Sequence, residues 1–202
     1  MFKNVLVLSP HTDDAEIGAG GTIAHLVEKG YNVEMFAFSW CENKDNISSV
    51  KEASKILGIK ENNLKIFEFE RRRFPRQRQE ILQILYDHNR ENGIDLVLTP
   101  TTTDLHQDHS VVTMEAMRAF KRTTILGYEL PWNNIQITTS SFFPLEERHV
   151  EKKIKALQCY KSQVGRYYFT EDYFRSIVKM RGTQIQTKYA EAFEVIKFVP
   201  KL

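Results

Sequence analysis

Two polar segments of the chain contain the residue types that bind divalent metal ions. Residues 10–16 read Pro-His-Thr-Asp-Asp-Ala-Glu, and residues 104–109 read Asp-Leu-His-Gln-Asp-His. Imidazole and carboxylate groups together suit Zn²⁺, and three protein ligands with a vacant fourth position keep a water molecule bound for catalysis. The adjacent carboxylates of Asp13 and Asp14 can divide two tasks, because one can bind the ion while the other takes a proton from water. The pattern predicts metal-assisted hydrolysis.

The later segment offers a similar division between His106 and His109. One imidazole can be a metal ligand and the other an acid, while Asp108 could hold one of the rings in a chosen tautomer. Each segment alone has a structural alternative, since acidic residues after a strand often cap a helix and histidines often lie on a solvated loop. The metal site is favoured because both segments follow apolar runs that are typical of buried strands.

These segments can meet only if neighbouring strands carry them. Five short apolar runs have the length of buried strands: residues 4–9, 33–38, 64–69, 94–98 and 124–128. Segments with apolar residues at helical spacing lie between them: residues 22–30, 50–57, 76–92 and 111–120. This alternation predicts an α/β fold, a Rossmann-like three-layer sandwich with a mostly parallel sheet. Ligands of such sheets bind at the carboxyl ends of the strands.

The last third of the chain departs from this alternation. A strand is expected at residues 135–138, helices at 146–160 and 171–180, and a final edge strand at 190–199. The sequence contains no internal repeat and no convincing linker, so a single domain over residues 1–202 is expected.

Composition excludes several classes of protein. A chain of 202 residues with 42% hydrophobic residues fits one compact globular domain. The net charge of +2 is too small to indicate a nucleic-acid partner by bulk electrostatics. Cys41 and Cys159 lie far apart in sequence, which argues against a disulfide framework and suits the cytoplasm. The first apolar run is too short for a signal peptide or a membrane span. Nothing in the sequence marks the oligomeric state, so a homo-oligomer stays open.

Residues 10–22, Pro-His-Thr-Asp-Asp-Ala-Glu-Ile-Gly-Ala-Gly-Gly-Thr, together with His106-Gln-Asp-His109, resemble the PIG-L/LmbE-like family of zinc-dependent N-deacetylases. The signatures of that family are HPDDxE followed by GGT, and HPDH. Further matches follow the family order along the chain: Glu52, residues 57–58, Lys153, residues 156–157, 160–163, 181–182 and 189–193. The resemblance therefore spans nearly the whole chain.

The resemblance implies a role for six of these residues. The implied zinc ligands are His11, Asp14 and His109. Asp13 would be the general base. His106, oriented by Asp108, would help to stabilise the oxyanion and to protonate the leaving amine.

Thr12 and Gln107 depart from the family pattern, which usually has proline at both positions. Both residues flank the chemistry without supplying it. Losing the fixed φ of proline could loosen the two loops, so these departures bear on the affinity or the positioning of the metal.

The resemblance implies a zinc-dependent hydrolase that removes the acetyl group from an N-acetylated amino sugar, an N-acetylglucosamine-type conjugate. Fe²⁺ or another divalent ion is the alternative cofactor. Two other classes are weighed against it: a nucleotide- or S-adenosylmethionine-binding Rossmann-like transferase, and a non-catalytic metal-binding module. The glycines at positions 18, 20 and 21 lack the G-x-G-x-x-G spacing of a dinucleotide loop, and they are expected to allow tight helix packing.

Two features bear on the substrate. Residues 71–78 contain five arginines directly after the third predicted strand, of which Arg73 is the choice for holding a carboxylate or phosphate. The alternative is a solvated start of a helix. Trp40 follows the second predicted strand and could stack on a sugar ring, with packing as the equal alternative. The expected partner is thus a small N-acetyl amino-sugar conjugate, with an anionic group as an option.

Overall fold

A seven-stranded β-sheet forms the centre of the protein, whose computed structural model describes residues 3–200. The strands lie in the order β3-β2-β1-β4-β5-β7-β6. Their bounds are β1 (Asn4–His11), β2 (Asn32–Ser39), β3 (Leu64–Ile66), β4 (Leu96–Pro100), β5 (Thr124–Tyr128), β6 (Ser141–Leu145) and β7 (Tyr189–Lys197). The first five strands pair in parallel, whereas β7 pairs antiparallel with both β5 and β6.

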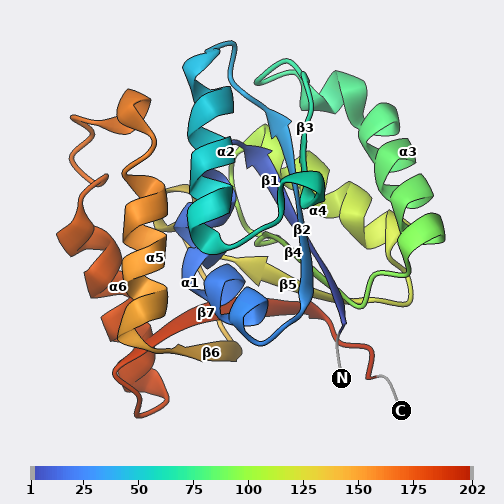
Figure 1. The fold of residues 1–202 in the computed structure, drawn as a ribbon. Coiled ribbons are helices and arrows are strands. Elements are labelled where there is room, and N and C mark those ends of the chain that lie inside the picture. Colours follow the sequence, from blue (N-terminus) through green and yellow to red (C-terminus); the bar gives the residue numbers. More distant parts are fainter. Residues whose placement is uncertain (1–2, 201–202) are drawn as a thin grey trace.

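Helices cover both faces of this sheet (Figure 1). They are α1 (Asp14–Glu28), α2 (Asp45–Leu57), α3 (Phe74–Asn92), α4 (Gln107–Ala119), α5 (Glu147–Leu157) and α6 (Glu171–Gln184). Side chains alternate between the two faces of a strand. In β1, Val5 and Val7 accordingly join the core under α1, α2, α5 and α6, while Leu6 and Leu8 join the core under α3 and α4. The structure confirms the predicted α/β fold with three layers and a mostly parallel sheet.

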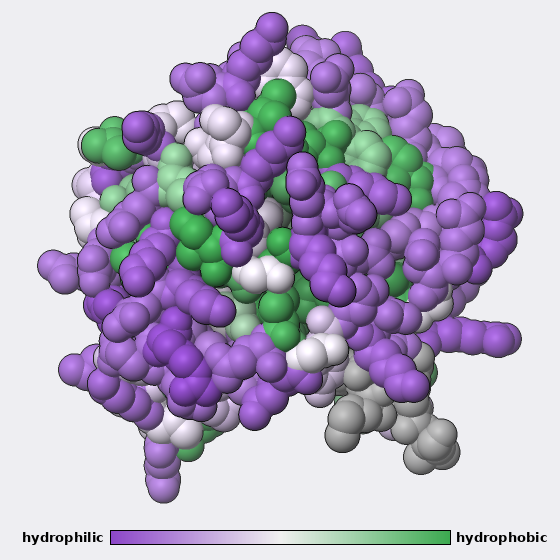
Figure 2. Space-filling view, in the orientation of Figure 1, coloured by the Kyte–Doolittle hydropathy of each residue, from purple (hydrophilic) through white to green (hydrophobic). Residues whose placement is uncertain are grey.

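The surface in the orientation of Figure 1 is mostly hydrophilic, with apolar side chains in small areas between the charged ones (Figure 2). Among residues 3–200, no helix has the length and apolar character needed to cross a membrane.

The C-terminal elements differ from the prediction in two respects. Residues 135–138 form no strand; Ile135 is 85% exposed, and the strand that pairs with β7 begins six residues later, at Ser141. The last strand, β7, was expected at an edge of the sheet but lies between β5 and β6, where its residues Ala190, Ala192 and Phe193 are buried. Those two expectations are wrong because the local pattern does not show that Phe142 and Phe143 supply the outer partner of β7.

Helices α1 and α4 both begin earlier than predicted, so each polar segment runs directly into the first turn of a helix. In α1 the difference arises because Gly18, Gly20 and Gly21 lie inside the helix and pack against the core. A Cβ on Gly18 would lie 2.1 Å from Cδ2 of Tyr128, and one on Gly21 would lie 2.5 Å from Cδ1 of Leu145. Glycine is therefore required for α1 to approach the sheet this closely, which confirms the expectation of tight packing.

A buried ion pair lies against the backbone of α1. Lys153 in α5 donates from Nζ to the carbonyl of Ile17 at 2.6 Å and lies 2.5 Å from Oε1 of Glu191 in β7. The Glu191 carboxylate in turn accepts from the backbone N–H groups of Gly21 at 3.0 Å and Thr22 at 2.6 Å. Side chains from α5 and β7 thus form hydrogen bonds with backbone groups in the middle of α1.

Gly18→Ala is expected to destabilise the fold by roughly 1–3 kcal/mol, the cost of overpacking a core. The added methyl group would displace Tyr128, whose hydroxyl donates to the carbonyl of Leu8 at 2.8 Å. Urea unfolding measures this loss. Gly20→Ala is the matched control, because the nearest atom to its Cβ would be Cγ of Lys153 at 3.0 Å, a much smaller overlap than the 2.1 Å at Gly18. Equal stability of the two variants would contradict the packing explanation.

Candidate metal centre

The two polar segments meet because neighbouring strands deliver them. Strand β1 ends at His11, and β4 ends at Pro100, shortly before α4 begins at Gln107. These strands pair in parallel, with Val5 opposite Leu96, so their carboxyl ends lie at the same edge. The chain runs outward from β1 through β2 to β3 and then returns to β4 on the other side, which makes β1/β4 the switch point where such sheets bind ligands.

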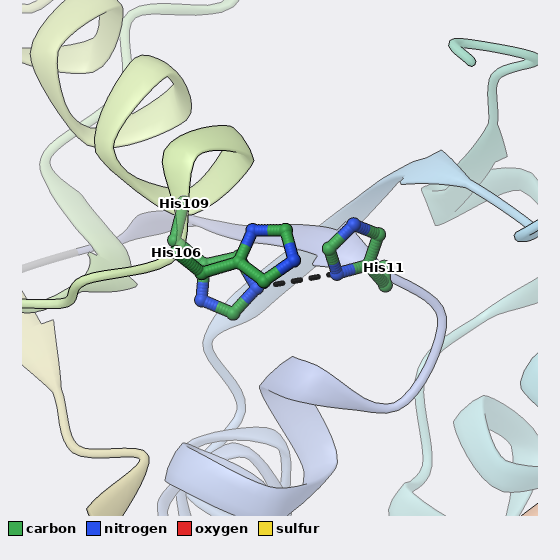
Figure 3. Close-up of side chains that lie close together, drawn as sticks. All are labelled: His11, His106 and His109. Atoms are coloured by element: carbon green, nitrogen blue, oxygen red, sulfur yellow. Dashed lines mark hydrogen bonds between the residues drawn. The ribbon is translucent and has the colours of Figure 1, made fainter. Parts of the chain in front are cut away.

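Three donor atoms converge at this switch point. Nδ1 of His11 and Nε2 of His109 each lie 3.1 Å from Oδ2 of Asp14, and the two nitrogens lie 3.2 Å apart. His11 is the last residue of β1 and His109 lies in α4, and their side chains point toward each other (Figure 3). Ligands of a tetrahedral ion with bonds of about 2.0–2.1 Å lie roughly 3.3 Å from one another. The residues therefore fit a divalent metal with little rearrangement.

Each of the two imidazoles is backed by a second carboxylate. Nε2 of His11 lies 3.0 Å from Oδ2 of Asp108, and Nδ1 of His109 lies 2.8 Å from Oδ2 of Asp104. Both carboxylates are buried. A hydrogen bond from the outer nitrogen fixes the tautomer, so that the inner nitrogen presents its lone pair to a metal. This arrangement is typical of metal-binding histidines.

The structure reassigns the contact expected of Asp108. Its side chain was expected to orient His106 but instead binds His11, because residue 108 already lies in the first turn of α4 and there faces β1. Asp104, to which the sequence pattern assigned no role, orients His109. The sequence signal that could have identified Asp104 is its position, because it follows the carboxyl end of a strand and precedes His109 by five residues.

His106 occupies the N-cap of α4, beside the three converging atoms. Its Nδ1 accepts the backbone N–H of Asp108 at 3.2 Å, which leaves the ring proton on Nε2. The ring stacks on that of His109 with the centroids 4.5 Å apart. Ligand atoms of His11, His106 and His109 lie within 4.8 Å of one another, so these three histidines form a group that could hold a metal ion. The set with Asp14 in place of His106 is the tighter of the two.

Asp13 occupies the N-cap of α1, yet its side chain makes no capping hydrogen bond. Its carboxylate lines the cavity next to the three donor atoms. Burial, together with the neighbouring Asp14 carboxylate, raises the pKa of Asp13 against the smaller opposing effects of His11 and Arg166. An acidic side chain with a raised pKa that is not used in capping is suited to take up a proton.

The charges of the site follow from the same contacts. Burial opposes ionisation of Asp14, but His109 and His11 outweigh it and hold the pKa of that carboxyl well below its usual range. Burial is likewise outweighed at His11, whose pKa the Asp108 and Asp14 carboxylates raise to about 8. Burial and the two neighbouring imidazoles lower the pKa of His106 to about 4. His106 is therefore neutral near pH 7, whereas metal binding must displace a proton from His11.

The loop between β1 and α1 is tied to the C-terminal part of the chain. The hydroxyl of Tyr160 donates to the carbonyl of Thr12 and lies 2.7 Å from Oε1 of buried Glu16. Burial raises the pKa of Glu16 to about 8. This contact anchors the loop at Thr12.

Gln107 is the first residue of α4. At this position a proline would only preset φ, because the N–H group of a first helical residue has no partner within the helix.

A cavity of about 470 Å³ opens at the converging atoms. The rings of Trp132 and Tyr168 stack on its wall with their centroids 4.3 Å apart. Three arginines also line it: Arg71, Arg72 and Arg166. Trp132 received no role from the sequence, although its position after β5, beside β4, places it at the same edge of the sheet.

The two substrate-binding residues chosen from the sequence do not line this cavity. Nε of Arg73 lies 3.4 Å from Oε1 of Glu70, and its neighbours Arg71 and Arg72 reach the cavity instead. Trp40 lines a separate hollow together with Ile66 and other residues, because β2 ends one strand away from the β1/β4 edge. The arginine run does reach the site, but through different members.

A family model described as PIG-L: GlcNAc-PI de-N-acetylase matches residues 6–120, which include both polar segments.

Two curated proteins are similar to the chain over most of its length. The uncharacterized deacetylase YaiS of Escherichia coli K12 is 27% identical over 171 aligned positions, covering 79% of this chain and 91% of YaiS. The diacetylchitobiose deacetylase of Thermococcus kodakarensis is 26% identical over 229 aligned positions, covering 98% of this chain and 84% of that protein.

Solved structures share the fold. The conserved protein TT1542 from Thermus thermophilus is 22% identical with a TM-score of 0.81, and the match covers 100% of this chain and 98% of that one. GalB, the 4-carboxy-2-hydroxymuconate hydratase from Pseudomonas putida KT2440, is 20% identical with a TM-score of 0.79 and coverage of 99% and 98%. Because a hydratase also has this fold, the fold alone does not determine the reaction.

Proposed function

The chain belongs to the PIG-L family of de-N-acetylases, and from that premise we propose that it hydrolyses the acetamide of a small N-acetylated amino sugar at a divalent metal ion. Residues 1–202 would form one catalytic domain. The observation that carries the proposal is the set of three donor atoms 3.1–3.2 Å apart, with a carboxylate behind each imidazole.

His11, Asp14 and His109 are the proposed ligands, and zinc is the proposed ion because two imidazoles and one carboxylate form a donor set that it favours. Fe²⁺ is the alternative. When bound, the ion would act as a Lewis acid that polarises the acetamide carbonyl and makes water more acidic. Asp104 and Asp108 are positioning residues in this proposal, since each acts through a histidine.

Asp13 and His106 perform the proton chemistry. Asp13 takes a proton from the attacking water while the water oxygen bonds to the carbonyl carbon. His106 donates a hydrogen bond from Nε2 to the oxyanion that develops on the carbonyl oxygen. Protonated Asp13 then returns its proton to the nitrogen, the C–N bond breaks, and acetate and a free amine leave. We assign this last proton to Asp13 because His106 keeps its ring proton on Nε2 as a neutral donor.

An N-acetylglucosamine-type conjugate is the proposed substrate. The relative from Thermococcus kodakarensis is named for a disaccharide of N-acetylated sugars, and the stacked rings of Trp132 and Tyr168 offer the apolar surface on which a sugar ring packs. A cavity of about 470 Å³ is within the range of small-molecule sites. The two free cysteines, Cys41 and Cys159, are compatible with the proposed cytoplasmic location.

Removal of the metal is expected to abolish acetate release, and one equivalent of Zn²⁺ is expected to restore it. The protein is treated with a chelator, desalted and assayed for free amine on N,N'-diacetylchitobiose and a panel of N-acetylglucosamine conjugates. A protein that binds zinc but deacetylates nothing would be the non-catalytic metal-binding module. Binding of S-adenosylmethionine or a nucleotide by a protein without zinc would identify the transferase.

A further inference from the structure

We infer that the hydroxyl of Tyr160 positions the proposed general base, Asp13, by holding the backbone carbonyl of the preceding residue, Thr12. Tyr160 lies 148 residues further along the chain than Thr12 and does not line the cavity, so it would act without touching the substrate. It is therefore a positioning residue. The inference rests on the proposed function and adds a residue to which that function assigns no role.

The loop between β1 and α1 contains three consecutive backbone carbonyls, those of residues 11–13. The first accepts a hydrogen bond from the hydroxyl of Ser9, and the third accepts one from the N–H group of Ile17 at 3.0 Å. Both donors are close in sequence to their acceptors. The middle carbonyl, that of Thr12, accepts instead from the hydroxyl of Tyr160, which follows α5. The direction of the middle carbonyl therefore depends on a distant part of the chain.

The direction of this carbonyl determines how the chain enters Asp13. The carbonyl of Thr12 and the N–H group of Asp13 belong to one planar peptide unit, so a hydrogen bond that fixes one also fixes the other. Threonine has no ring that would restrict φ at position 12. The side chain of Asp13 makes no capping hydrogen bond, so α1 does not hold it in place. The backbone of the loop is therefore what aims the Asp13 carboxylate into the cavity.

The hydroxyl of Tyr160 is itself held in a fixed place. The Tyr160 side chain is 1% exposed and packs in the core that contains the inner residues of α1. Oε1 of Glu16, a fully buried side chain in the first turn of α1, lies 2.7 Å from the hydroxyl oxygen. The hydroxyl thus connects the loop to the start of the helix that Asp13 caps. Catalytic groups need such support from side chains whose own rotamers are locked by packing.

Tyr160 also begins the segment that forms one wall of the cavity. Its carbonyl accepts the N–H group of Gln163 at 2.9 Å, and Gln163, Arg166 and Tyr168 all line the cavity. A substitution that removes only the hydroxyl of Tyr160 leaves this backbone contact in place. Substrate binding at the wall should therefore survive the loss of the hydroxyl, whereas the placement of Asp13 should not.

Tyr160→Phe removes the hydroxyl and keeps the ring. We expect kcat to fall by roughly 10–100-fold, the effect of losing an outer support or of misplacing a catalytic group by about 1 Å. KM and the zinc content are expected to stay close to those of the unmodified enzyme. The assay is steady-state deacetylation at saturating Zn²⁺ of N,N'-diacetylchitobiose, or of the N-acetylglucosamine conjugate that the enzyme hydrolyses fastest.

Tyr128→Phe is the matched control. Tyr128 is also fully buried, and its hydroxyl donates to a backbone carbonyl of β1, that of Leu8, at 2.8 Å. Both variants lose one buried hydrogen bond, so urea unfolding should show similar losses of stability. Only Tyr160→Phe should lower kcat strongly. Equal losses of kcat in the two variants would mean that the hydroxyl of Tyr160 only stabilises the fold, which would overturn the inference.

A double-mutant cycle tests whether Tyr160 acts through Asp13. If it does, Tyr160→Phe should change the residual kcat of Asp13→Asn by a much smaller factor than it changes the kcat of the unmodified enzyme. A structural role would lower kcat by the same factor in both backgrounds. Equal factors would therefore contradict the inference, and so would loss of zinc from Tyr160→Phe, because the effect would then fall on the metal ligands.

Hydrogen exchange tests the inference without relying on activity. In the zinc-loaded protein, the backbone amides of residues 11–15 are expected to exchange faster in Tyr160→Phe than in Tyr128→Phe, because only the first variant releases the loop. Equal exchange in the two variants would refute the role of Tyr160. If the unmodified protein deacetylates nothing, the proposed function fails on that result, and the exchange measurement still decides whether Tyr160 holds the loop.

Discussion

Asp13→Asn is expected to lower kcat by roughly 10²–10⁴-fold, the contribution of a positioned general base, while the protein keeps its metal. Asparagine has nearly the same shape as aspartate but cannot accept the proton from water. The Asp13 side chain neither caps α1 nor belongs to the three converging donor atoms, so the fold and the metal affinity should survive its replacement.

The measurement combines steady-state deacetylation with metal analysis of the same preparation. Asp45→Asn is the control, because Asp45 is an exposed aspartate near the start of another helix that follows a strand, and it does not line the cavity. A variant with full activity would remove Asp13 from the mechanism. A variant that loses its metal would instead make Asp13 a ligand.

Asp14→Asn is expected to weaken metal binding by more than the roughly 10–100-fold that follows loss of an outer carboxylate. Oδ2 of Asp14 lies 3.1 Å from both proposed ligand nitrogens, so its negative charge would directly offset the positive charge of the ion. Asp104→Asn is the comparison, and it is expected to lower the metal affinity by only the roughly 10–100-fold that is usual for an outer carboxylate. This variant changes only the acceptor that orients His109. Competition with a chromophoric chelator measures the affinities of the two variants and of the unmodified protein.

His106→Ala decides between the two possible ligand sets. If Asp14 is the third ligand, this variant keeps its metal affinity and loses activity. If the three histidines are the ligands, His106→Ala loses the metal and Asp14→Asn retains much of it. The second result would contradict the proposed site and leave the metal-binding group of three histidines in its place.

The sequence alone was sufficient to predict the strands that position the candidate site. The apolar runs before His11 and before Asp104 follow the rule for buried parallel strands, and neighbouring strands of that kind end at the same edge. The meeting of the two segments could therefore be predicted, with β1 and β4 as neighbours in the sheet.

The contacts within the site could not be predicted, because they depend on where each helix begins. Asp108 faces His11 rather than His106 because α4 starts at Gln107, four residues earlier than the apolar spacing indicates. The placement of Arg73 outside the cavity was equally unpredictable, since the loop before α3 contains a left-handed φ at Arg72. Local patterns do not encode such turns unless glycine or proline marks them.

The ion pair between Lys153 and Glu191 has a consequence for folding during synthesis. The backbone groups of α1 at Ile17, Gly21 and Thr22 bond to side chains that leave the ribosome much later. Helix α1 begins at Asp14, close to His11, so the first part of the candidate metal centre would lack these contacts until Glu191 has emerged. A truncated translation product that ends before Glu191 would carry every proposed metal-binding side chain and still lack the Glu191 contacts to its first helix.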